Sequence, residues 1–188
     1  MEKESLKTFN IITLWDSGVG KTSIINRYIN NKFDHNIACT LGLTYAYKEI
    51  KFNNKDKIRL KLFDTAGQEK YRALSKSYFK NADAVLFVFN MNDKETFDTI
   101  KEWVESFKNV NVKGNVPQYL VGNKNDLERK IEQSLIEEFI CKNNIPFIST
   151  SAKKNNKIDR LFEEIGQKLY IDFIKKEIKF KIILLLNI

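Results

Sequence analysis

The sequence is poor in the residue types and segments that mark membrane, secreted or multidomain chains. It has no run of about 20 apolar residues, so it predicts no transmembrane helix. Its two cysteines, Cys39 and Cys141, lie far apart, match no metal-binding spacing and fit a reducing compartment. It has two prolines, no low-complexity linker and no internal repeat, so it predicts one domain. Its charged start, MEKESLK, does not resemble a secretory signal peptide.

A dense basic patch is also missing, although the formal net charge is +8. Such a charge can attract an acidic surface, such as a layer of lipid headgroups or a nucleic acid. The lysines are scattered, however, and no stripe of Lys and Arg interleaved with aromatic residues occurs. Because Asn, Ile and Lys are all abundant, a compositional bias is the simpler interpretation, and we expect no nucleic-acid partner.

Short apolar runs alternate along the chain with segments of helical periodicity. This alternation predicts an α/β fold: a six-stranded, mostly parallel sheet with one antiparallel edge strand and helices on both faces. Ligands of such sheets bind beyond the carboxyl ends of the strands. Strands are predicted at 9–15, 43–52, 57–63, 84–90, 117–123 and 145–150, and helices at 21–30, 95–109, 132–142 and 156–176.

The segment WDSGVGKT, from Trp15 to Thr22, follows a predicted strand and opens a predicted helix. It matches the P-loop pattern G-x-x-x-x-G-K-[ST] except that Trp15 replaces the first glycine. In a P-loop, main-chain N–H groups hold phosphate oxygens, Lys21 reaches the outer phosphates and the Thr22 hydroxyl binds Mg²⁺. A chance glycine turn is the alternative. The predicted phosphate-binding residues are Ser17, Gly18, Val19, Gly20, Lys21, Thr22 and Ser23.

A second motif, DTAGQE, begins at Asp64, where a predicted strand ends. Asp64 can hold Mg²⁺ through water, the Gly67 N–H can point toward a terminal phosphate, and Gln68 can orient an attacking water. A polar turn is the alternative, but this motif about 40 residues after a P-loop is hard to obtain by chance. We therefore predict Asp64 as a metal ligand, and Gln68 and Lys21 as catalytic residues.

Two further loops can read a guanine base. In VGNKND, the Asp126 carboxylate can accept hydrogen bonds from N1–H and the 2-amino group, which adenine cannot offer. Asn123 can bond the other edge of the ring, and Lys124 can lie along its plane with its aliphatic stem. In TSAKK, the Ala152 N–H can bond the guanine carbonyl oxygen and Lys153 flanks the base. A solvated loop is the alternative for the Asn and Lys residues.

Ser151, in the same TSAKK motif, and Phe33 complete the predicted base site. Phe33 can pack on the edge of the base or be a core aromatic residue at a helix end, and both interpretations remain open. An ATP-using P-loop enzyme is a competing function, but Asp126 and Ala152 argue against it because both recognise groups of guanine.

Together the motifs resemble the Ras superfamily of small GTPases, and within it the Rab branch. DSGVGKTS, DTAGQE, NKND and TSAK stand in the family's order and spacing, and the resemblance covers about residues 7–172. It implies a P-loop NTPase domain over 1–176 that binds GTP or GDP with Mg²⁺ and slowly hydrolyses GTP as a molecular switch. It also implies that Thr40 binds Mg²⁺ and senses the third phosphate.

The resemblance implies partners as well. Tyr45, Phe63 and Tyr78 match the aromatic trio that many Rab effectors contact, although the family usually has Trp where this chain has Phe63. An exchange factor and a GTPase-activating protein are also implied, and no arginine in 31–42 can act in cis. We expect a cytoplasmic monomer that serves vesicle traffic, with the cytosolic face of an endomembrane as a further location.

The chain departs from the Rab pattern after residue 176. Rab proteins usually end in a tail with prenylated cysteines, whereas here no cysteine follows Cys141 and residues 177–188 form a short apolar tail. The end of the sequence is then truncated or misread, the protein is not prenylated, or the tail itself touches a membrane surface. A plain extension of the last helix is the fourth interpretation.

Trp15 is the other departure. If its position needs φ > 0, tryptophan costs about 1–3 kcal/mol. If it needs only space, the strand order that the resemblance implies places the indole near 64–66, at the start of the second switch segment. This motivates an alternative function, a GTP- or GDP-binding scaffold with impaired hydrolysis. A local pocket that accepts the indole without consequence, or a sequencing error, would leave the switch unaffected.

Overall fold

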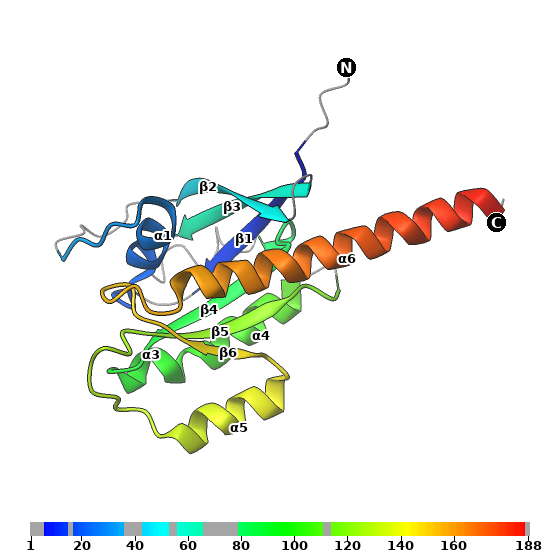
Figure 1. The fold of residues 1–188 in the computed structure, drawn as a ribbon. Coiled ribbons are helices and arrows are strands. Elements are labelled where there is room, and N and C mark those ends of the chain that lie inside the picture. The colour runs from blue at the N-terminus through cyan, green and yellow to red at the C-terminus, as the bar shows by residue number, and fades with distance from the viewer. Residues whose placement is uncertain are drawn as a thin grey trace.

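The computed structural model gives the chain a layered α/β architecture around one sheet (Figure 1). It describes residues 6–14, 17–35, 43–52, 56–65, 79–110 and 114–186, with the backbone alone at 43 and 65. In chain order the elements are β1 (Thr8–Leu14), α1 (Lys21–Asn30), β2 (Leu43–Phe52), β3 (Asp56–Thr65), β4 (Ala84–Asn90), α3 (Lys94–Asp98), α4 (Ile100–Val110), β5 (Gln118–Asn123), α5 (Gln133–Asn143), β6 (Phe147–Ser149) and α6 (Ile158–Leu186).

The strands of the described ranges form one six-stranded sheet in the order β2-β3-β1-β4-β5-β6. β2 runs antiparallel to β3, and the other neighbours pair in parallel. Because parallel strands need long crossovers, helices alternate with strands along the chain. The predicted fold class is therefore confirmed. β1 lies between β3 and β4. Its last residue, Leu14, therefore lies near the carboxyl ends of these two strands.

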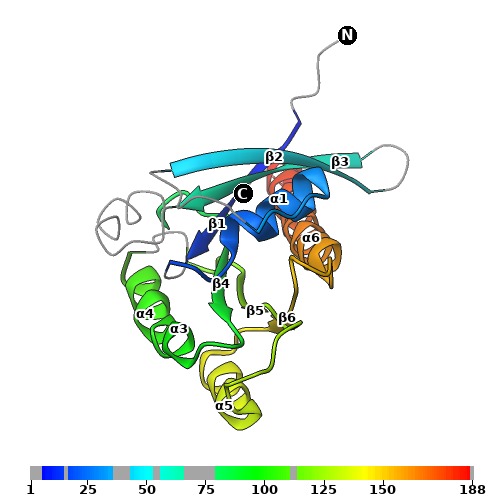
Figure 2. The ribbon, with the colours of Figure 1, turned by 90° about the vertical axis from the view of Figure 1, so that its left-hand side faces the viewer.

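Two apolar clusters bury the two faces of the sheet. Side chains alternate along a strand, so Leu86 and Val88 of β4 belong to one cluster and Val85 and Phe87 to the other. Helices α1 and α6 cover the first face, and α3, α4 and α5 cover the second (Figure 2). All seven residues of β4 are buried, as its unbroken apolar run predicts.

Helix α6 packs on the sheet through its first half. The ring of Phe162 stacks on that of Tyr28 in α1, with centroids 4.1 Å apart. A Cβ at Gly166 would lie 2.5 Å from Ile50 Cδ1, so glycine permits the close approach of α6 to β2. Burial raises the pKa of the Tyr28 phenol, which therefore stays protonated in this packing.

The segment predicted as one helix at 95–109 consists of two, α3 and α4, which meet at Thr99. The Thr99 hydroxyl donates to the Thr96 carbonyl at 3.1 Å, and the Glu102 N–H bonds the Thr99 carbonyl three residues back. A threonine hydroxyl that competes for main-chain acceptors tightens a helix turn in this way. The predicted inward positions are correct, since Phe97, Ile100, Val104 and Phe107 are all buried.

The last helix also differs from its predicted extent of 156–176, because α6 continues to Leu186. No glycine or proline follows Gly166, so nothing in the local sequence stops it. Strand β6 is shorter than predicted, with three residues. Within the described ranges, no helix combines the length and apolarity that crossing a bilayer requires.

Candidate nucleotide-binding site

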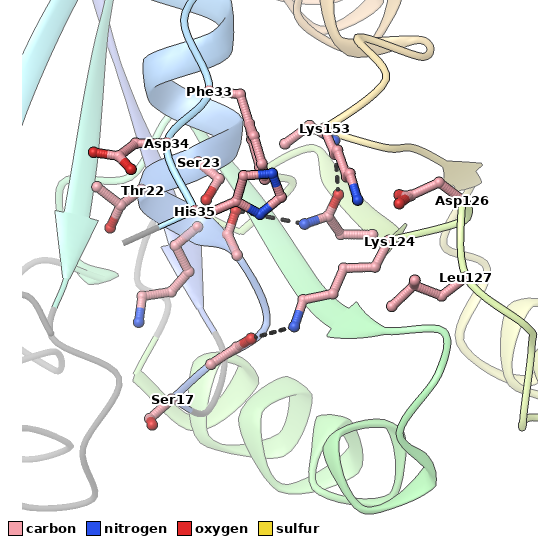
Figure 3. Close-up of a pocket in the computed structure, with 15 residues that line it drawn as sticks. Ser17, Thr22, Ser23, Phe33, Asp34, His35, Lys124, Asp126, Leu127 and Lys153 are labelled. Carbon is pink, nitrogen blue, oxygen red and sulfur yellow. Dashed lines mark hydrogen bonds between the residues drawn. The ribbon is translucent and has the colours of Figure 1, made fainter. Parts of the chain in front are cut away.

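A cavity of about 480 Å³ lies at the carboxyl ends of the parallel strands. Figure 3 shows side chains of α1 on one side of it and those that follow β5 on the other. It brings together most of the described residues that the sequence predicted. The lining consists of Ser17, Gly18, Gly20, Lys21, Thr22, Ser23, Phe33, Asp34, His35, Asn123, Lys124, Asp126, Leu127, Ala152 and Lys153.

The phosphate side of the cavity is the loop that leads from β1 into α1. Gly18 and Gly20 have φ angles of 81° and 93°, in a region that L side chains rarely adopt. A Cβ at Gly20 would also lie 2.5 Å from Asn123 Nδ2. Helix α1 begins at Lys21, which is 8% exposed. The first main-chain N–H groups of a helix have no partner within the helix, so this end of α1 can bind an anion.

Asn123 connects the phosphate side to the base side. It is 1% exposed and donates a hydrogen bond of 2.9 Å to the Val19 carbonyl. Its Oδ1 accepts from the Ala152 N–H at 3.2 Å and from the Thr150 hydroxyl at 3.4 Å. The buried Asn123 amide thus joins its own segment to two others, at Val19 and at Ala152. Each of these lies more than 25 residues from Asn123 along the chain.

On the base side, hydrogen bonds hold two charged side chains, those of Lys124 and Asp126. Lys124 Nζ donates to the Gly18 carbonyl at 2.7 Å, so its stem spans the cavity between the two loops. The Ser151 hydroxyl donates to the Asp126 carboxylate, which fixes that carboxylate at the cavity wall. Because carboxylate oxygens accept hydrogen bonds, this wall can recognise two neighbouring N–H donors of a ligand.

The remaining predicted site residues differ in where the structure places them. Val19 and Ser151 are buried behind the lining and contribute through contacts with Asn123 and Asp126. Phe33 packs against the core cluster under α1 and also lines the cavity, so its position is compatible with a contact to the edge of a base. Four predicted functional residues lie outside the described residues: Thr40, Gly67, Gln68 and Tyr78.

Comparison with known proteins gives the family. The family described as Ras matches residues 10–171. The chain belongs to the Ras family. It is 36% identical over 169 residues to the Ras-related protein Rab-11B of Dictyostelium discoideum, covering 89% of this chain and 76% of that protein. It is 36% identical over 155 residues to the Ras-related protein SEC4 of Saccharomyces cerevisiae, covering 81% and 70%. The GTP-binding protein ypt1 of Schizosaccharomyces pombe is 31% identical over 163 residues, covering 86% and 79%.

These relatives confirm the Rab-like resemblance within the Ras family. As a Ras-family member, the chain is a GTPase that binds GTP and GDP with Mg²⁺. The predicted metal ligands fit this ion, because the Thr22 hydroxyl and the buried Asp64 carboxylate lie 2.8 Å apart and both offer hard oxygen ligands. When bound, Mg²⁺ supplies positive charge against the phosphate oxygens. Thr22 and Asp64 would hold it at the start of α1.

Sequence reasoning missed one residue that fixes the base side, Arg27 of α1. Its Nε donates to the Ala152 carbonyl at 2.8 Å, and its NH2 donates to the Lys153 carbonyl at 3.3 Å. Its guanidinium also lies 6.0 Å from the centroid of the Phe33 ring. No motif marks an arginine within a helix, although its place six residues after the P-loop lysine, nearly two turns along α1, is a usable signal. Asp34, His35 and Leu127, which also line the cavity, each directly follow predicted residues or one another.

Two residues of the predicted effector trio, Tyr45 and Phe63, pair across the hairpin of β2 and β3, but only Tyr45 is exposed. Tyr45 is 57% exposed, and its ring centroid lies 6.2 Å from that of Phe63, its cross-strand neighbour. Lys61 Nζ lies 4.2 Å from the Tyr45 centroid and 4.8 Å from that of Phe63. Tyr45 and Lys61 therefore combine aromatic area with a cation on the hairpin, whereas Phe63 is 8% exposed and belongs to the second core cluster.

Proposed function

We propose that the cavity holds GDP and GTP, and that the chain is a slowly hydrolysing switch that regulates vesicle traffic. The observation that carries this proposal is the pair of bonds from Asn123 to Val19 and Ala152. They join a phosphate-binding loop to a base-binding loop, and a nucleotide is the ligand that needs both at once. The traffic role is supported by the likeness to Rab-like relatives.

The base side suits guanine. Asp126 lines the cavity as a hydrogen-bond acceptor and can take N1–H and the 2-amino group together. The Ala152 N–H, proposed to bond the guanine carbonyl, donates to Asn123 here, so it would share its hydrogen between the two acceptors. Lys124 and Lys153 lie at the two sides of this wall and can flank the base.

The phosphate side suits a nucleotide with Mg²⁺. We assign charge neutralisation to Lys21 and metal binding to Thr22 and Asp64, supported by the 2.8 Å contact between the last two. Thr40 would add a metal ligand, and Gln68 would orient the attacking water. The assignments of these two residues and of Gly67 rest on the sequence motifs alone.

Partner proteins would recognise the GTP-bound state. Loss of the third phosphate releases the segments that contact it, so a partner surface beside them exists in one state only. We assign effector contact to Tyr45, Phe63 and Tyr78, and we expect an exchange factor and a GTPase-activating protein to act on a monomer. The cytosolic face of an endomembrane is the expected place of action.

Base specificity tests the site. The purified protein should contain GDP, and fluorescent GDP bound to it should be displaced by GTP but not by ATP. Asp126→Asn should weaken GTP binding by at least about 100-fold, since a carboxylate that accepts two bonds is lost. It should improve binding of xanthosine triphosphate, which carries a carbonyl where guanine carries the amino group.

The matched control is Glu128→Gln, which neutralises an exposed carboxylate outside the cavity lining. This variant should bind all three nucleotides as the unmodified protein does. Tight ATP binding by the unmodified protein, or equal effects of the two substitutions, would contradict the guanine assignment.

The second candidate function is a GTP- or GDP-binding scaffold with impaired hydrolysis. The observation behind it is Trp15 at the position where the P-loop pattern has glycine. It shares the nucleotide site with the first proposal and differs only in the rate at which bound GTP is lost.

A further inference from the structure

The second half of α6 leaves the body of the protein. Its last contacts with the sheet are aromatic: Tyr170 stacks on Phe52 of β2 with centroids 4.6 Å apart, and Phe173 meets Phe9 of β1 at 6.2 Å. Beyond them the helix projects past the sheet and ends at the far right of Figure 1. From residue 175 to residue 186 every described side chain is exposed.

This projecting segment is divided along its axis into a basic part and an apolar part. Residues 175–181 contain four lysines and one glutamate, a net charge of +3. We call the four lysines the lysine collar: Lys175, Lys176, Lys179 and Lys181. Residues 182–186, the apolar tip, read IILLL, and their side chains are 40% to 83% exposed.

The apolar tip is apolar on every side of the helix. Five consecutive residues span more than one turn of 3.6 residues, so no polar face remains along the tip. A helix that is apolar all round is stable when it is surrounded, whereas a groove on one partner covers only one face. The tip therefore suits an apolar medium more than a docking groove.

We propose that the apolar tip inserts into the surface of a membrane that contains anionic lipid, with the lysine collar at the headgroups. At a rise of about 1.5 Å per residue, Leu186 lies about 7.5 Å from Lys181 along the helix axis, so the apolar tip is adjacent to the lysine collar. Helices at a membrane surface bury apolar side chains to a depth of about 5–10 Å and keep lysines on the polar side. Lysine stems can lie along the apolar boundary while their ammonium groups meet lipid phosphates and carboxylates. This inference is independent of the nucleotide site.

The direction of α6 makes this docking compatible with access to the cavity. The helix begins beyond β6, near the base side of the cavity, and runs back to the opposite end of the sheet. Tyr45 pairs with Phe63 near the carboxyl end of β3, whereas Phe52, which packs on α6, lies at the other end of the same hairpin. A membrane at the tip therefore leaves nucleotide and partner surfaces in water.

A second copy of the chain fits the segment less well. Side-by-side packing of two tips would bring two lysine collars together, and like charges repel at such distances. An anionic headgroup layer meets the same lysines with opposite charge. Charge complementarity thus favours lipid as the occupant.

Vesicle sedimentation tests the proposal with the full chain in its GDP-bound form. Vesicles of phosphatidylcholine with about 30% phosphatidylserine should bind the protein, and vesicles of phosphatidylcholine alone should bind it at least tenfold more weakly. The double variant Leu184→Glu and Leu185→Glu should lose at least tenfold in binding, because it places charge in the apolar tip.

The double variant Lys179→Glu and Lys181→Glu should weaken binding by at least about 25-fold, since each lysine near an anionic surface contributes about fivefold. Its control, Lys130→Glu with Lys142→Glu, makes the same charge change at exposed lysines outside α6 and should bind almost as the unmodified chain does. GDP binding should be equal in all variants, which separates this proposal from the nucleotide assignment.

Three results would overturn the proposal: unchanged vesicle binding by the tip variant, equal losses in the collar variant and its control, or no binding to the anionic vesicles. Lipid-free dimerisation that the tip variant abolishes, without vesicle binding, would assign the tip to a second copy. Sedimentation equilibrium on the same samples measures that outcome.

Discussion

The side-chain amide of Asn123 donates a 2.9 Å hydrogen bond to the main-chain carbonyl of Val19, between loops that lie 104 positions apart in the chain. Because Asn123 is 1% exposed, water does not replace this bond when it is broken. The same amide accepts from the Ala152 N–H, so the shapes of the phosphate side and the base side are coupled. Substitutions at either side should therefore change the retention of the whole nucleotide.

Asn123→Ala should release GDP about 10- to 100-fold faster than the unmodified protein. It leaves the buried Val19 carbonyl and Ala152 N–H without this partner, at about 1–3 kcal/mol. Dissociation of a fluorescent GDP measures the rate. The control is Asn125→Ala, which removes a 2.9 Å bond to Ser149 on the outer side of the same loop and should change release little. Equal release rates for both variants would show that the coupling is not specific to Asn123.

Gly20→Ala should destabilise the protein more than Gly18→Ala does. Both glycines have positive φ, which costs an L residue about 1–2 kcal/mol. At Gly20 the added Cβ would also meet Asn123 Nδ2 at 2.5 Å, whereas nothing described lies within 4 Å of the Cβ position at Gly18. Free energies of unfolding from urea titrations of nucleotide-free protein compare the two. A larger loss in Gly18→Ala would show that backbone strain outweighs the contact with Asn123.

Arg27→Lys should accelerate GDP release by about fivefold to tenfold while leaving guanine specificity intact. An ammonium group cannot reproduce the two bonds that the planar guanidinium donates to the carbonyls of Ala152 and Lys153. The charge is kept, so the effect isolates the geometry of the donor. The same release assay measures it, with Arg160→Lys as the control, because that exposed arginine pairs with Glu164 within α6. Unchanged release in Arg27→Lys would assign Arg27 to packing alone.

Elements with a strong local pattern were predictable from the sequence. Helix α1 and strand β4 have the predicted bounds, because a glycine turn opens the first and an unbroken apolar run defines the second. The break at Thr99 was not predictable, since it depends on one hydroxyl that finds a main-chain acceptor within the helix. Helix α6 continues beyond the predicted 156–176 to Leu186, in agreement with the interpretation of the tail as a plain extension of the last helix.

The residues of the candidate site also divide into those that a local sequence pattern marks and those that depend on tertiary contacts. Motif residues such as Lys21 and Asp126 have a recognisable spacing, and they line the cavity as the sequence predicts. Arg27 and the bond between Ser151 and Asp126 depend on which loops the sheet order places together, and that information is tertiary. Sequence spacing therefore predicts which groups line the cavity, while the fold decides which groups hold them in place.

Trp15→Gly should hydrolyse GTP several-fold faster than the unmodified protein in single-turnover measurements. The sheet order places β1 beside β3, so Leu14 lies next to the strand that carries Asp64, the first residue of the DTAGQE motif; Trp15 itself lies outside the described residues. We expect a bulky side chain at this position of the P-loop pattern to compete for room with the segment that positions Gln68 against the attacking water. Gln68→Leu in both backgrounds is the control, because the gain should vanish when the water-orienting residue is absent. Equal hydrolysis rates for Trp15→Gly and the unmodified protein, with and without a Rab-type activating protein, would exclude crowding and leave the slow-switch proposal as it stands.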